Sequence, residues 1–115
     1  MNRGGLLVSR SPFSQAIWSY KMRPMDLLFW LFIGILGGNA VPHLVKGITK
    51  ESYPCALGNG PVPNFIGGWL SFVMALVLAR LALSSRVSDL DLIAGSIGFL
   101  LIGLFHASIG AFGRK

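Results

Sequence analysis

Residues 27–45 read LLFWLFIGILGGNAVPHLV and contain no formally charged side chain. Two further stretches, residues 52–79 and 92–113, also lack Asp, Glu, Lys and Arg. A helix that crosses a hydrocarbon core of about 30 Å needs about 20 predominantly apolar residues, and each stretch is long enough. The sequence therefore predicts an all-α integral membrane protein with three transmembrane helices in a small bundle.

The composition favours the same class. Of the 115 residues, 53% are hydrophobic and 12% are charged, against about 25% charged in an ordinary soluble domain. The net charge of +6 comes from basic residues that flank the apolar stretches, which favours lipid head groups over nucleic acid. We expect the partners to be the lipid bilayer and a homo-oligomer or larger membrane complex, with no nucleic acid.

The chain divides into two predicted regions. Residues 1–24 form a basic N-terminal arm, and residues 25–115 form the three-helix domain, with spans at about 25–45, 64–83 and 90–112. Pro24 suits a first helical turn, and Ser88 or Asp89 is the expected N-cap of the third helix. A loop rich in Gly and Pro, residues 46–63, joins the first two spans.

Small residues recur at four-residue spacing in each span. Such spacing lets the backbone of another helix approach closely, which drives helix association in lipid. The predicted packing residues are Gly34 and Gly38 in the first span, Gly67, Ser71, Ala75 and Ala79 in the second, and Gly103, Ala107 and Ala111 in the third. We expect these ridges to pack on one another or on a partner.

The basic residues also predict an orientation. Six Lys and Arg residues lie on the side of the N-terminus and four on the other side, and the richer side faces the cytoplasm. We therefore expect a bacterial inner-membrane protein with a cytoplasmic N-terminus and an external C-terminus. Arg80 and Arg86 are the expected head-group anchors, because long basic side chains reach lipid phosphates from span ends.

Two histidines are predicted to lie at similar depth. At 1.5 Å per residue, His43 lies about 25 Å along its helix from Asp26, and His106 about 22 Å from Asp91. A matched pair could bind haem b or a metal, since imidazole is a common ligand of both. Two independent interfacial histidines would give the same pattern, and no third ligand has metal spacing. No cofactor is therefore predicted, and the metal ligands are unknown.

Pro42 is expected to disturb the first span. It removes a backbone donor and clashes with the Gly38 carbonyl, so the helix should bend or unwind over residues 37–42, with the Asn39 amide beside the freed carbonyl. Alternatively, Pro42 ends the span. Interrupted helices with polar side chains hold the sites of many transporters. Together with the histidines, Asn39 and Pro42 complete the candidate ligand or pathway residues.

The segment PHLVKGITKESYP, residues 42–54, carries a His-x-x-x-Gly-Ile motif after the first span. It resembles small bacterial inner-membrane proteins that have this motif at the same place. The resemblance covers about residues 37–72 and implies the architecture rather than an activity.

Several enzyme classes find no support in the sequence. Apart from Asp26 and Asp91 at the starts of their spans, no acid lies inside a span, and no CxxC, metalloprotease or phosphate-loop motif occurs. Small multidrug exporters rely on a membrane-embedded carboxylate, which these spans lack. The predicted function is a structural or accessory subunit that acts by helix packing with itself or a partner. The alternatives are a haem- or metal-binding redox protein using His43 and His106, and an oligomeric transporter or channel.

Overall fold

The computed structural model describes residues 11–12, 24–82 and 86–109. They contain three long helices: α2 (Pro24–Ile48), α3 (Pro61–Ala82) and α4 (Asp89–Ser108). At 1.5 Å per residue these are about 37, 33 and 30 Å long, enough to cross a membrane. Each helix is also apolar enough to do so. The predicted all-helical membrane fold with three spanning helices is confirmed.

The helix bounds differ from the expected spans mainly at the first connection. The first helix continues three residues past the expected end at residue 45, and α3 begins three residues before residue 64. The connecting loop is therefore shorter than expected and covers residues 49–60. The basic arm up to residue 23, apart from residues 11–12, lies outside the described residues, as do residue 83 and residues 110–112.

Pro42 neither unwinds nor ends the first helix. The helix continues through Pro42 to Ile48, so the expected unwinding and the alternative that Pro42 ends the span are both wrong. Contacts with α3 hold the turns that follow it: a Cβ added at Gly47 would come within 2.8 Å of the Phe65 backbone nitrogen. Membrane helices tolerate proline where neighbouring helices support the backbone.

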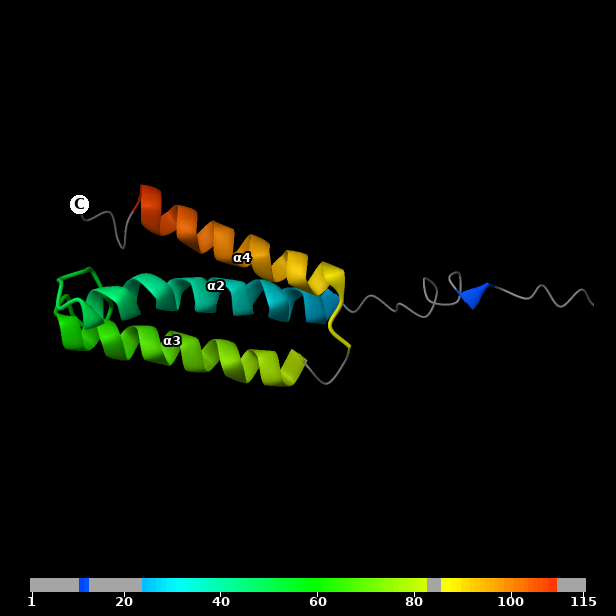
Figure 1. Ribbon diagram of the computed structural model, residues 1–115, viewed down its shortest axis with the longest axis horizontal. Coiled ribbons are helices and arrows are strands. Elements are labelled where there is room, and N and C mark those ends of the chain that lie inside the picture. Colours follow the sequence, from blue (N-terminus) through cyan, green and yellow to red (C-terminus); the bar gives the residue numbers. More distant parts are fainter. Residues whose placement is uncertain (1–10, 13–23, 83–85, 110–115) are drawn as a thin grey trace, which may run out of the picture.

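The helix α2 is the centre of the bundle. It lies between α3 and α4 in Figure 1 and packs against both, whereas α3 and α4 hardly touch each other. The α2–α3 loop and the C-terminal end of α4 lie at the same end of the bundle (Figure 1). Residues near the end of α2, the start of α3 and the end of α4 are thereby brought together.

Glycines allow α2 and α4 to approach closely. A Cβ at Gly34 would overlap the Gly95 carbonyl oxygen, and one at Gly98 would overlap the carbonyl oxygen of Leu31. A Cβ at Gly38 would come within 2.5 Å of the Ile102 side chain. Gly34 and Gly38, both predicted as packing residues, therefore lie in the α2–α4 contact.

The packing stripe of α3 differs from the predicted ridge. Gly68, rather than Gly67, lies against α2, since a Cβ there would be 3.0 Å from the Ala40 carbonyl oxygen. Gly67 instead faces the Sγ atom of Cys55 in the loop. A strict four-residue spacing drifts round a helix by about 40° per step, so a straight contact stripe alternates steps of three and four. The buried residues of α3 are Asn64, Gly68, Ser71, Ala75 and Ala82, and Ala79 is half-buried.

The two described residues of the predicted ridge in the third span do not pack inside the chain. Gly103 and Ala107 are exposed on α4, and a Cβ at Gly103 would meet nothing within 4 Å. Ala111 lies outside the described residues. Whether this ridge meets a partner remains a prediction.

The N-cap of α4 is Ser88, one of the two residues expected at this position. Its hydroxyl accepts a hydrogen bond from the Asp91 backbone N–H at 3.0 Å, and its own backbone N–H donates to Asp91 Oδ2 at 2.8 Å. This reciprocal capping box satisfies two backbone donors at the start of the helix. Both side chains are buried.

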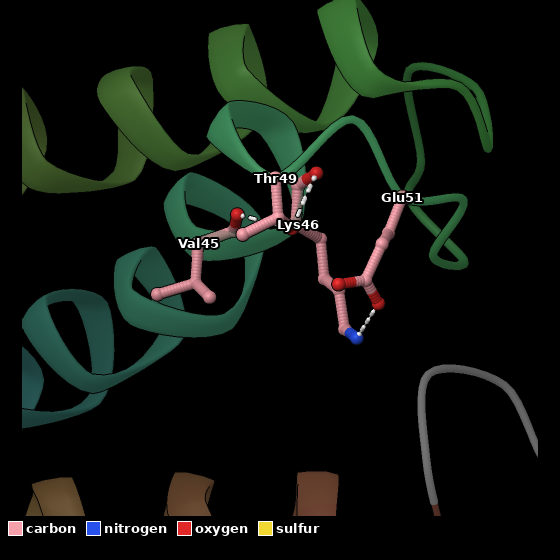
Figure 2. A network of polar contacts seen from close by, with 4 residues as sticks. All are labelled: Val45, Lys46, Thr49 and Glu51. Carbon is pink, nitrogen blue, oxygen red and sulfur yellow. Dashed lines mark hydrogen bonds and ion pairs between the residues drawn. The ribbon is translucent and has the colours of Figure 1, made fainter.

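A Schellman motif ends α2. The Glu51 backbone N–H donates to the Lys46 carbonyl and that of Lys50 to the Gly47 carbonyl, which is the pattern of this cap. Lys50 takes the left-handed position with φ of 59°, where glycine is usual. In Figure 2 the Thr49 hydroxyl donates to the Val45 carbonyl and the Lys46 ammonium pairs with the Glu51 carboxylate, so side chains reinforce the turn.

Candidate functional site

Asn64 is the centre of a buried polar cluster at the loop end of the bundle. Its side chain has no exposed surface. Its amide nitrogen donates to the backbone carbonyls of Tyr53 at 2.7 Å, Gly60 at 2.9 Å and Asn59 at 3.1 Å. Because these partners only accept, the amide oxygen must face the other way, toward His43 Nδ1 at 2.8 Å. The His43 Nδ1 atom therefore carries a hydrogen and donates it.

A second hydrogen-bonded chain crosses all three helices. The Ser71 hydroxyl donates to the Leu36 carbonyl at 2.8 Å and accepts from the Asn39 amide nitrogen at 3.3 Å. The Asn39 amide oxygen then accepts from His106 Nε2 at 3.0 Å. His106 Nδ1 is left as the acceptor of the uncharged ring, and it receives the Tyr53 hydroxyl at 2.9 Å. The Leu36 carbonyl at the end of this chain can only accept, and this determines which group donates in each of the other hydrogen bonds.

The two predicted histidines meet at this cluster. Their ring centroids are 5.7 Å apart with planes at 82°, and the Tyr53 ring lies 5.4 Å from that of His43. Edge-to-face contacts of this kind suit neighbouring aromatic rings. The structure therefore brings His43, His106 and Asn39 together, in agreement with the equal depth expected for the histidines.

One of the other expectations for this region needs correction. The Asn39 amide bonds Ser71 rather than the carbonyl freed by Pro42. Pro42 itself has no part in either hydrogen-bonded chain, and it does not line the pocket described below. Its place among the candidate ligand or pathway residues stays a prediction.

The sequence interpretation missed the roles of Tyr53, Asn64 and Ser71 in the cluster. Tyr53 lies in the loop, and Ser71 was assigned to helix packing alone. Asn64 did carry a usable signal, because an amide at the start of an apolar span costs free energy unless it is hydrogen-bonded. The partners themselves come from three different elements, so no local pattern joins them.

A pocket of about 400 Å³ adjoins the cluster. Its polar lining includes Asn39, His43, Ser71, His106 and Cys55. Apolar side chains from all three helices line the rest: Leu36 from α2, Leu70 and Met74 from α3, and Phe105 from α4. Among the described residues that line the pocket, none carries a carboxylate, an ammonium or a guanidinium group.

His43 keeps one nitrogen free beside this pocket. Only 7% of the residue is exposed, and its Nε2 atom forms no hydrogen bond with any described residue. Within the described part of the chain, no fully buried side-chain nitrogen or oxygen lacks a partner. Nε2 therefore retains accessible surface, and in the uncharged imidazole it is an acceptor, since Nδ1 carries the hydrogen.

The histidine pair does not fit a haem as it is arranged here. Axial ligation by both residues requires one free ring nitrogen from each. Both nitrogens of His106 are bonded, to Tyr53 and to Asn39, and the two imidazoles touch edge to face. Among residues 11–12, 24–82 and 86–109, no group of three His, Cys, Asp or Glu side chains could hold a metal ion.

Comparisons with known proteins give no relative for this chain. No protein family, curated protein or solved structure matches it. Its function therefore has to be inferred from the helices, the polar cluster and the pockets.

Proposed function

We propose that this protein is a structural or accessory membrane subunit that acts by helix packing, with a second copy or with a larger membrane protein. The observation that carries this proposal is a groove of about 580 Å³ beside α2. Small residues of α2 and α4 lie in it, including Gly37, Ala40 and Gly95, and large rings such as Trp30 and Phe99 flank them. A Cβ at Gly37 would meet nothing within 4 Å.

Such a groove suits a helix because of how helices associate in lipid. Lipid tails are as apolar as leucine, so association depends on van der Waals packing and close backbone approach. Gly37 offers that approach on a face of α2 that neither α3 nor α4 covers. The polar cluster supports this function by tying the loop and the ends of all three helices into one rigid unit.

The two alternatives have less support. A haem would require His106 to give up its bond to Tyr53 or Asn39. A transporter pathway would use the polar groups of Asn39 and His43, but Asn39 has its amide nitrogen and oxygen bonded to Ser71 and His106. Hydrogen bonds between helices favour a role in holding the bundle together.

For the location, we propose the bacterial inner membrane with a cytoplasmic N-terminus. The polar cluster and the α2–α3 loop would then face outward, and Arg80 and Arg86, both exposed, would anchor the cytoplasmic side. Fusion of a reporter that is active on one side only to the C-terminus tests this orientation. Activity on the cytoplasmic side would contradict it.

Substitution in the groove tests the function. We expect Gly37→Leu to fill the groove and to lower the fraction of protein in cross-linked oligomers or complexes, measured in native nanodiscs. Gly103→Leu is the matched control, because it adds the same side chain at an equally open position on the exposed ridge of α4. Loss with Gly103→Leu alone would move the interface to that ridge, and a strictly monomeric, partner-free wild-type protein would contradict the proposal.

A further inference from the structure

We propose that the 400 Å³ pocket at the loop end of the bundle binds a neutral amphiphile that carries a hydroxyl group. The hydroxyl donates a hydrogen bond to His43 Nε2, and the apolar chain lies against Leu36, Leu70 and Met74. This binding site is separate from the groove at Gly37, so the two proposals stand independently.

The acceptor at the polar end is set by the surrounding structure. Asn64 cannot rotate its amide without turning its oxygen toward three carbonyls, so it holds the His43 hydrogen on Nδ1. The Nε2 lone pair is consequently directed away from Asn64 and has no partner among the described residues. Nε2 is a partly accessible acceptor without a partner among the described residues, and a donor from a ligand would supply the hydrogen bond that it lacks.

The other polar side chains of the pocket are already engaged. Asn39 and His106 bond each other, and the Ser71 hydroxyl donates to a backbone carbonyl. Cys55 Sγ lies 3.7 Å from the Pro63 carbonyl oxygen, its acceptor. His43 Nε2 is an acceptor without a hydrogen-bond partner among the described residues, and it favours a ligand that donates.

The charge of the pocket selects a neutral donor. An ammonium head group would be buried without a carboxylate, because the described lining residues include no acid. A carboxylate head group would lack a Lys or Arg for the same reason. Burying an unpaired charge costs several kcal/mol, so a hydroxyl is the donor that fits.

Size and lining fit a small lipid-like molecule. The volume lies within the range of about 300–1,000 Å³ that is usual for small-molecule sites. The exposed area of the lining is mostly apolar, and Asn39, Ser71 and His106 of its polar lining belong to one hydrogen-bonded chain. A hydroxyl at one end and an alkyl chain along the remainder match this division.

The single cysteine provides a direct test. Cys55 lines the same pocket and is the only cysteine in the chain, so its alkylation by N-ethylmaleimide can be followed by intact mass. We expect decanol to slow this alkylation in nanodiscs. Decyl methyl ether, which keeps a similar chain and oxygen but cannot donate, should need a concentration roughly fivefold higher for the same protection, the effect of one hydrogen bond.

Two variants separate the acceptor from the structural role of His43. His43→Asn keeps a donor attached to Cγ for Asn64 and removes Nε2, so protection by decanol should fall to that of the ether. His43→Gln places an acceptor one bond further along, near the position of Nε2, and should retain the preference for decanol. Equal protection by alcohol and ether in the wild-type protein, or no protection by either, would overturn the proposal whether or not the variants fold.

Discussion

Asn64 and His43 form a buried hydrogen bond of 2.8 Å that joins the first turn of α3 to the last turns of α2. The same asparagine amide holds three carbonyls of the intervening loop. One side chain therefore connects two helices to the loop between them. It also determines which nitrogen of His43 has no hydrogen bond with any described residue.

Replacing this asparagine should destabilise the bundle strongly. Asn64→Leu leaves His43 Nδ1 and the Tyr53 carbonyl without their partner, and each unsatisfied buried group costs about 1–3 kcal/mol. The Asn59 and Gly60 carbonyls lose the same side-chain donor but each keeps a backbone N–H donor. We expect a loss on the order of 3 kcal/mol in total, since the loop can relax and recover some bonds. Unfolding in mixed micelles measures it. Asn59→Ala, which removes an exposed side chain and keeps the backbone carbonyl, should change the stability little; equal losses would contradict the assignment.

The contact between α2 and α4 should be intolerant of a single methyl group. Gly34→Ala would drive a Cβ into the Gly95 carbonyl, and overpacking of this kind costs about 1–3 kcal/mol. Gly103→Ala, with open space around its Cβ, should be neutral or stabilising by up to about 1 kcal/mol through helix propensity. Thermal melts followed by circular dichroism compare the two. A melting temperature unchanged by Gly34→Ala would show that the helices are further apart.

The capping box of α4 should contribute measurably to stability. Ser88→Ala removes the side-chain acceptor of the Asp91 N–H, and loss of such a cap costs about 1 kcal/mol. Amide hydrogen exchange in the first turn of α4 should become faster. Ser96→Ala serves as the control, since its hydroxyl only bonds back to the Ile93 carbonyl in the same helix. Exchange that is equally fast in both variants would argue against the cap.

Position 50 should accept glycine more readily than any other residue type. Its φ of 59° costs an L-residue about 1–2 kcal/mol relative to right-handed conformations, and glycine avoids that cost. Lys50→Gly is expected to stabilise the protein by up to about 1 kcal/mol, the remainder being lost to unfolded-chain entropy. Lys50→Ala separates this effect from the removal of the lysine side chain and should give no gain. Comparing the free energies of unfolding of the two variants with that of the wild-type protein tests this expectation.

The Glu51 carboxylate, which forms the ion pair at the end of α2, should have a pKa below the ordinary value for glutamate. A hydrogen bond from the Lys46 side chain lowers the pKa of Glu51. A lowered pKa in the folded state means that the pair stabilises the fold above the unfolded-state pKa and that this contribution is lost as the pH falls through the folded value. An NMR titration of the Glu51 carboxyl carbon should show the low midpoint, and Lys46→Met should return it toward the ordinary value. If Lys46→Met leaves the midpoint unchanged, Lys46 is not the cause of the lowered pKa of Glu51.

Properties that depend on short stretches were predictable from the sequence. Three uncharged stretches long enough to cross a bilayer determined the three helices, because a charge or an unsatisfied backbone is costly in lipid. The rise per residue placed His43 and His106 at equal depth, and local chemistry placed Ser88 at the N-cap of α4. Each of these rests on spacing along one element.

The tertiary structure alone decided how the elements meet. Pro42 lies inside a continuous helix because contacts with α3 hold the turns that follow it. On α3, Gly68 rather than Gly67 lies against α2, because a straight contact stripe on a helix alternates steps of three and four residues. The bonds of Asn39 to His106 and of Tyr53 to His106 join residues 67 and 53 positions apart. Their formation depends on the crossing of three helices, which local spacing does not specify. The free Nε2 atom of His43 depends on the packing of α2 against α3, because Asn64 of α3 is the residue that bonds Nδ1.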